Sequence, residues 1–197
     1  QRISFPLWAK MALVFGGLSS VLILGLGLWD YQQDLQREAQ QRQARLEGVA
    51  RTLAATIDGG MFASFQTTGD MERPEHVRLT ETLRTARTAH EIRWIGASAA
   101  DDRGRYYFVI DGGRPPPLPV GYPIFDGVAL RDRVLAGEVV FEPAMTDEWG
   151  RWTVAMAPIH HTDGQVVGVV EVMDDAAWQE LSAREQLKGT RVLEQLE

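Results

Sequence analysis

Cysteine is absent from this chain of 197 residues. Without thiols the chain can form neither a disulfide framework nor a thiolate metal site, and the absence is compatible with an oxidising compartment. The net charge of -7 comes without a basic cluster, so nucleic acid is not an expected partner. The acidic residues are scattered along the chain and are interpreted as solvated surface.

Motifs for catalysis are also missing from the sequence. It has no glycine-rich loop that would cradle a phosphate, no nucleophile elbow and no pair of carboxylates at catalytic spacing. His160, His161 and Asp163 crowd a single hairpin turn and lack a separated third ligand for a metal. We therefore expect no enzymatic activity, no metal and no cofactor.

An uncharged run of 19 residues, Met11 to Trp29, is the longest such segment of the chain. As a helix with a rise of about 1.5 Å per residue it would extend roughly 28 Å, close to the thickness of a bilayer core. No small-residue cleavage site follows it. The run predicts an uncleaved transmembrane helix in contact with membrane lipid, with a buried core helix as the alternative. Arg2 and Lys10 precede it and Asp30 follows it, which favours a cytoplasmic segment at residues 1–10.

The next segment, residues 30–58, has strong helix composition and contains no proline. It is predicted to continue the first helix as a stalk. Leu46, Val49, Leu53 and Ile57 form one apolar stripe on it. The stripe either covers the domain's own sheet or also pairs with a second copy of the chain, and a homodimer through the stalk helix is expected on the second interpretation.

Residues 59–180 are predicted to form one α+β domain. Gly59 and Gly60 end the stalk, and a second helix is expected from Pro74 to about His90. A short helix is expected over residues 127–136, and a final helical segment is expected over residues 181–197. Turn residues separate segments of strand character, which predicts a PAS-like antiparallel sheet of five strands with flanking helices. The strands are expected at residues 92–97, 105–111, 138–142, 151–159 and 165–173.

From about Glu72 to Trp178 the chain resembles the extracytoplasmic PAS-like sensor modules called Cache or PDC domains. The resemblance is carried by IRWIGASAADDRGRYYFVIDG, VGYPIFDG, LAGEVVFEP and TDEWGRWTVAMAPIHHTDGQVVGVVEVMDD, and most specifically by the D-x-W-G-x-W turn at residues 147–152. It implies a single-pass protein of the bacterial inner membrane with its main domain in the periplasm. It also implies a sensor that passes its state to a cytoplasmic output of diguanylate cyclase or histidine kinase type. The competing expectation is an interaction subunit whose domain docks to other proteins without a ligand.

Strand alternation separates two sets of side chains in each of two strands. Trp152, Val154 and Met156 face one way and Arg151, Thr153 and Ala155 the other, while Tyr106, Phe108 and Ile110 oppose Tyr107, Val109 and Asp111. A sensor of this type is expected to hold a small organic ligand between aromatic walls and a few polar groups. The candidates are Tyr107, Tyr122, Asp147, Trp149, Arg151 and Trp152. Alternatively, the aromatic rings fill the core, Asp147 caps the turn and Arg151 lies exposed.

Glu171 is a seventh candidate. Cache modules that bind amino acids often place an acid near the end of the last strand, and alignment puts Met173 at that position here. Glu171 shares a face with Met173 and would substitute for the missing acid. An unpaired carboxylate at an inward position would be costly, so an inward Glu171 needs an arginine or a ligand ammonium as its partner. An exposed Glu171 is the favoured expectation.

Overall fold

The computed structural model describes residues 6–113, 116–147 and 149–176. The chain divides into two compact units, residues 1–42 and residues 43–197. One helix, α1 (Leu7–Thr56), begins in the first unit and ends in the second. The predicted segment at residues 181–197 lies outside the described residues.

The structure does not support the predicted membrane span. Along the described residues, no helix combines the length and the apolar character needed to cross a bilayer. On this finding the predicted transmembrane helix at residues 11–29 and the single-pass inner-membrane localisation derived from it are wrong, and the expected membrane-lipid partner is not shown.

The second unit is built around a sheet that has six strands, not the five predicted. They are β1 (Trp94–Ala100), β2 (Tyr106–Asp111), β3 (Pro123–Ile124), β4 (Val140–Asp147), β5 (Gly150–His160) and β6 (Val166–Asp175). Every neighbouring pair is antiparallel, in the order β3-β2-β1-β6-β5-β4. The missed strand, β3, has only two residues, too few to show the alternation by which strands are recognised.

Short helices connect these parts. α2 (Gly59–Ala63) follows α1 directly, because the Asp58 carboxylate accepts a 2.7 Å hydrogen bond from the Met61 amide and caps a new helix where only a terminus was expected. A 3-10 helix, η1 (Thr68–Glu72), precedes α3 (Pro74–Ala89), which has the predicted proline in its first turn. α4 (Val128–Leu135) lies between β3 and β4, close to its predicted position.

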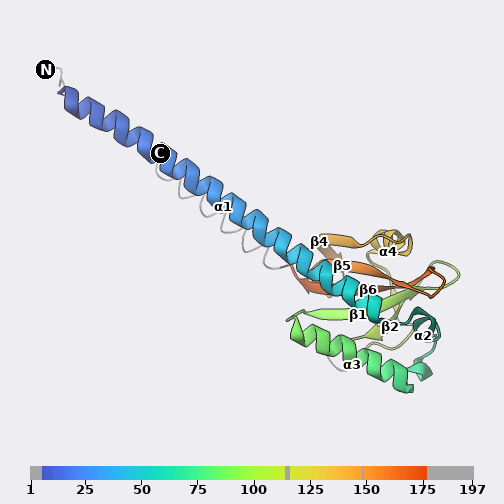
Figure 1. Cartoon of the computed structure of the whole chain (residues 1–197). Helices are drawn as coiled ribbons and strands as arrows, with labels where there is room; N and C mark the ends of the chain where they lie inside the picture. Colours follow the sequence, from blue (N-terminus) through green and yellow to red (C-terminus); the bar gives the residue numbers. More distant parts are fainter. Residues whose placement is uncertain (1–5, 114–115, 148, 177–197) are drawn as a thin grey trace. The chain divides into compact units, whose positions relative to one another are not determined.

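The helices of this unit cover opposite faces of the sheet (Figure 1). On one face, the end of α1 packs with α2 and α3 over a buried cluster that includes Leu46, Leu53, Phe62 and Leu83. The apolar stripe predicted on the stalk therefore covers the domain's own sheet. On the other face, α4 packs over a second cluster around Val134 and Met156. The two faces are thus occupied differently, and both Trp94 and Trp152 pack on the α4 face.

A β-bulge in β2 changes which residues share a face. Ala97 pairs with Ile110 and Ser98 pairs with Phe108, so Val109 is an extra residue without a partner in β1. The bulge places Ile110 beside Val109 in the cluster under α1 and α3. The regular alternation predicted for this strand is wrong beyond Phe108.

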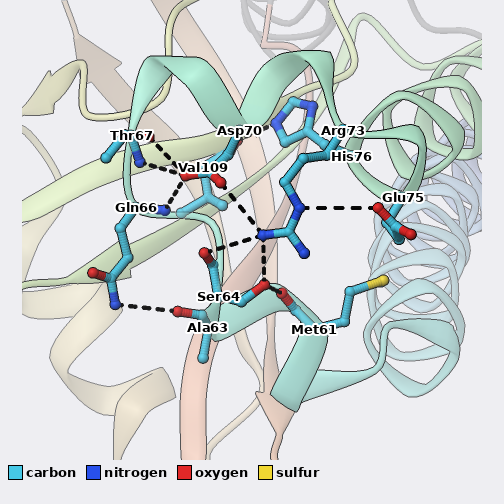
Figure 2. Close-up of polar contacts among 10 residues, drawn as sticks. All are labelled: Met61, Ala63, Ser64, Gln66, Thr67, Asp70, Arg73, Glu75, His76 and Val109. Carbon is cyan, nitrogen blue, oxygen red and sulfur yellow. Dashed lines mark hydrogen bonds and ion pairs between the residues drawn. The ribbon is translucent and has the colours of Figure 1, made fainter.

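A buried histidine of α3 provides a hydrogen-bond donor to the carbonyl group of the bulge residue Val109 (Figure 2). His76 Nε2 donates a 2.9 Å hydrogen bond to the carbonyl oxygen of Val109, and its Nδ1 lies 3.4 Å from the hydroxyl oxygen of Thr80. The ring of Phe65 packs edge-on against the imidazole at 5.1 Å. Because a buried carbonyl without a donor is costly, His76 stabilises the bulge through the helix that covers it.

The loop between α2 and α3 is ordered by Asp70 (Figure 2). Its Oδ2 accepts hydrogen bonds from the amides of Gln66 and Thr67 at 3.0 and 2.8 Å and from the Thr67 hydroxyl at 2.9 Å. The Arg73 guanidinium lies 3.3 Å from Oδ1 of Asp70 and also donates to the Ser64 hydroxyl at 3.1 Å. These donors, chiefly the Thr67 amide and hydroxyl, lower the pKa of Asp70 from 3.8 to about 2.

Candidate functional site

A cavity of about 330 Å³ opens on the α4 face of the sheet. Strands β1, β2, β4, β5 and β6 line it together with α4 and the loop around β3. Its walls are mostly apolar or aromatic, with four charged residues among them. The apolar and aromatic lining residues are Trp94, Phe108, Leu118, Pro123, Ile124, Phe125, Met145, Trp149, Trp152 and Met173. The charged ones are Arg93, Asp126, Arg131 and Asp147. A concave site of this size with few polar groups is typical of a small-molecule pocket.

Four aromatic rings form a connected group at one side of the cavity. Trp94 and Phe108 meet edge-to-face at 5.5 Å. Tyr122 and Trp149 lie 6.3 and 6.4 Å from Phe108 and 6.4 Å from each other. Trp149 is still 52% exposed and Phe125 is 80% exposed. These two exposed rings among the lining residues form the edge of the opening.

The D-x-W-G-x-W turn is held by a single oxygen atom. Asp147 Oδ1 accepts hydrogen bonds from the amides of Trp149 and Gly150 at 2.8 and 3.0 Å and from the indole of Trp152 at 2.8 Å. The carboxylate thereby closes the β4–β5 turn and fixes the indole of Trp152, and both tryptophans line the cavity. The alternative interpretation of Asp147, that it caps the turn, agrees with these contacts.

The base of the site contains a buried ion pair. Glu171 of β6 is 0% exposed and Arg131 of α4 is 1% exposed. Arg131 Nε donates to Oε1 of Glu171 at 2.8 Å, and Arg131 Nη2 donates to Oε2 at 2.5 Å. Ser98 of β1 donates a third hydrogen bond to Oε1. The expectation of an exposed Glu171 is wrong, and the arginine that an inward carboxylate requires is present.

Local backbone geometry makes room for this arginine. Gly127, which precedes α4, has a φ of 65°, and a Cβ there would lie 3.1 Å from Nη1 of Arg131 and 2.9 Å from Sδ of Met145. Nη1 donates to the Asp126 carbonyl in the same turn. A side chain at position 127 would be strained in the left-handed region and would also press on the guanidinium.

Asp111 organises the opposite edge of the cavity. Its Oδ1 accepts hydrogen bonds from the Trp94 indole and the Gly113 amide, both at 2.7 Å, and its Oδ2 accepts one from the Leu118 amide at 2.8 Å. The bulge at Val109 turns this carboxylate to the face of the sheet that carries the cavity. Regular alternation along β2 would have placed it on the opposite face. One side chain thus positions both a wall tryptophan and the loop that carries Leu118.

Tyr106 anchors α4 to the sheet. Its hydroxyl donates a 2.8 Å hydrogen bond to Asp132, and the Arg131 guanidinium lies 5.9 Å from its ring centre. Burial raises the pKa of the Tyr106 phenol, and the Asp132 carboxylate raises it further. The phenol is therefore a neutral donor at any physiological pH.

Comparison with known proteins agrees with this architecture. No family model and no curated protein matches the chain. The Escherichia coli DcuS sensor domain superposes with a TM-score of 0.51 at 16% identity, covering 72% of this chain and 94% of that chain. The chain has the PAS-like fold of a sensor domain. The fold predicted from the Cache resemblance is thereby confirmed.

Ligand-binding domains of a chemoreceptor are also similar. The Campylobacter jejuni Tlp3 domain in complex with L-valine gives a TM-score of 0.44, and the one with isoleucine bound gives 0.46, both at 13% identity over 87% of this chain. The chain spans 64% of the length of these Tlp3 chains.

The structure brings together four of the seven candidate residues. Asp147, Trp149 and Trp152 line the cavity, and Tyr122 packs on Trp149. Glu171 lies beneath it, paired with Arg131. The other two lie elsewhere. Tyr107 packs against the cluster on the face covered by α1 and α3, and the Arg151 side chain is exposed on β5.

Sequence reasoning missed Arg131, Trp94 and Phe108. Arg131 had a detectable signal, because it occupies the helical face of Val134 and Leu135, three and four residues later, where an apolar side chain is expected. An arginine at such a position indicates a buried carboxylate partner. Trp94 alternates with Gly96 and Ser98 along β1, and those small residues leave space above the strand.

Metal binding finds no support among the residues that the structure describes, where no group of three or more His, Asp and Glu side chains is suitably arranged. His161 and Asp163 form a 3.1 Å contact within the β5–β6 turn.

Proposed function

We propose that this chain is a sensor module that binds a small organic molecule in the cavity on the α4 face. The cavity carries the proposal: it is about 330 Å³ in volume, has aromatic walls and a few charged groups, and lies on the PAS-like fold of a sensor domain. No catalytic step is assigned to the chain.

The ligand would act by shifting a population of conformations. Residues of the same strands line the cavity on one face and contact the end of α1 on the other. In β6, Met173 lines the cavity, whereas Val170 and Val172 belong to the cluster under α1. A ligand that prefers one packing of the sheet biases the packing of α1, and the size of the bias equals its difference in affinity for the two states. In this proposal the chain is a homodimer through its stalk helix at residues 30–58. The helix α1 passes the state to an output domain of diguanylate cyclase or histidine kinase type.

A thermal-shift screen of the full chain tests ligand binding. The panel contains carboxylates, amino acids and polyamines, because a ligand specific to the native state raises the melting temperature with concentration. The shift should be lost in Trp149→Ala, which removes a cavity ring. It should persist in Val77→Ala, which truncates an exposed apolar side chain of α3 on the other face.

Two results would count against the proposal. One is a panel in which no compound shifts melting, and the other is a shift that Trp149→Ala leaves unchanged. In either case the competing function, docking to another protein without a ligand, would be favoured by the exposed Phe125 and Trp149 side chains.

A further inference from the structure

The charged groups around the cavity do not have equal access to a ligand. Of the four that line it, Arg131 is neutralised by Glu171, which binds two of its nitrogen atoms, while the third donates to the Asp126 carbonyl. Three of its five N–H groups are therefore already engaged. The remaining lining charges are those of Arg93, Asp126 and Asp147, which leave an excess of one negative charge.

The indole N–H groups of two cavity tryptophans are also occupied. Trp94 Nε1 donates to Asp111 and Trp152 Nε1 donates to Asp147, at 2.7 and 2.8 Å. These two tryptophans therefore present ring carbon atoms, rather than hydrogen-bond donors, to the cavity. Among the lining residues an anionic ligand would find one uncompensated cation, Arg93, whereas a cation would find electron-rich aromatic rings and two carboxylates.

The acceptors limit the kind of cation. Asp147 Oδ1 already accepts three hydrogen bonds, so of this carboxylate mainly Oδ2 is left for the three N–H donors of a primary ammonium. A methylated ammonium has no such requirement. It needs aromatic faces at close range and a nearby negative charge, and that combination recognises quaternary ammonium groups.

We propose that the cavity binds a small quaternary ammonium cation between the rings of Trp94, Trp149 and Trp152, with Asp126 and Asp147 supplying negative charge. The inference rests on the proposed function and specifies its ligand class. The small volume restricts the ligand to a compact molecule. The exposed Phe125 and Trp149 at the opening would close over it.

Calorimetric titration of the full chain with three probes of similar shape tests the charge. The probes are choline, its neutral isostere with carbon in place of the quaternary nitrogen, and pivalate, which carries the same branched group on a carboxylate. We expect choline to bind at least about tenfold more tightly than the isostere. Pivalate should show no saturable binding.

Variants of the full chain test the residues. Trp149→Ala should weaken choline binding by about tenfold or more, and Trp149→Phe, which keeps an aromatic face, should restore most of the affinity. Asp126→Asn should weaken binding by about two- to fivefold, because its exposed charge is partly screened. Asp102→Asn, a second exposed carboxylate outside the cavity lining, is the matched control and should bind like the unchanged chain.

Because Trp149 is half exposed, Trp149→Ala should keep its urea midpoint close to that of the unchanged chain, which separates lost binding from lost folding.

The outcomes separate this inference from the proposed function. If the isostere binds as tightly as choline, or if pivalate binds more tightly, the cationic ligand class is refuted while a cavity-binding sensor stands. If no probe binds and no compound of the wider panel shifts melting, both proposals fail together.

Discussion

Arg131 and Glu171 join α4 to β6 through two hydrogen bonds that are shielded from solvent, at 2.8 and 2.5 Å. Such a pair constrains the position of the helix, because a shift of α4 that broke these contacts would leave two buried charges unpaired. The carboxylate also holds Ser98 of β1. Three elements around the cavity are therefore linked through one side chain.

Removing one member of this pair should be far more costly than removing both. Arg131→Met leaves a buried carboxylate unpaired and should lower the free energy of unfolding by about 3–5 kcal/mol, measured by urea denaturation. The double variant Arg131→Met with Glu171→Met should recover much of that loss, since an apolar pair has no buried charge to satisfy.

The matched control lies on the same helix. Arg133 pairs with Glu138 at 2.8 Å, but these side chains are 54% and 53% exposed. Arg133→Met should cost less than about 1 kcal/mol. If the double variant were no more stable than Arg131→Met alone, the loss in the single variant would not come from an unpaired Glu171 carboxylate, and the prediction would be wrong.

Two glycines should respond to alanine in opposite directions. At Gly168 a Cβ would lie 2.3 Å from a ring carbon of Phe62 and 2.9 Å from the Ser98 carbonyl oxygen, so Gly168→Ala should cost about 1–3 kcal/mol. At Gly48, in the part of α1 that belongs to the sheet-containing unit, a Cβ would meet nothing within 4 Å. Gly48→Ala should stabilise by about 0.5–1 kcal/mol through helix propensity. Urea midpoints that shifted in the same direction would contradict this packing.

Replacing His76 should reveal the cost of the bulge. His76→Phe keeps the ring but removes the donor to the Val109 carbonyl, and should lower the free energy of unfolding by about 1–3 kcal/mol. His76→Gln retains a nitrogen donor near the same position and should lose less. Amide hydrogen exchange should show faster opening of β2 in the phenylalanine variant. Equal losses in the two variants would mean that packing, and not the hydrogen bond, is what the histidine supplies.

Asp70 should contribute a stability that depends on pH. Its pKa in the folded protein is about 2, below its ordinary value of 3.8, so the charged form is favoured by folding. The contribution is fully present above about pH 4 and is lost as pH falls toward 2. The difference in melting temperature between the unchanged chain and Asp70→Asn should be constant above this window and disappear below it. A difference that grew on acidification would have the wrong sign.

The sequence allowed much of the fold to be predicted, because its signals were local. The Pro74 start of α3, the apolar stripe ending at Ile57 and the alternation around Val154 each reflect one element packing on one neighbour. The six-stranded count and the bulge at Val109 depend on pairing between distant segments, which no local pattern records. The tryptophan turn was located from its residues, whereas Trp94 and Arg131 enter the site only through tertiary contacts.

The extra residue at Val109 has a consequence for comparing this chain with others. In a protein without this extra residue, the counterpart of Asp111 would lie one position earlier relative to β1. A sequence alignment without a gap at Val109 would then match residues whose side chains lie on opposite faces of the sheet. Homologue searches that permit a single-residue deletion at position 109 should therefore find more distant homologues than searches that penalise such a deletion.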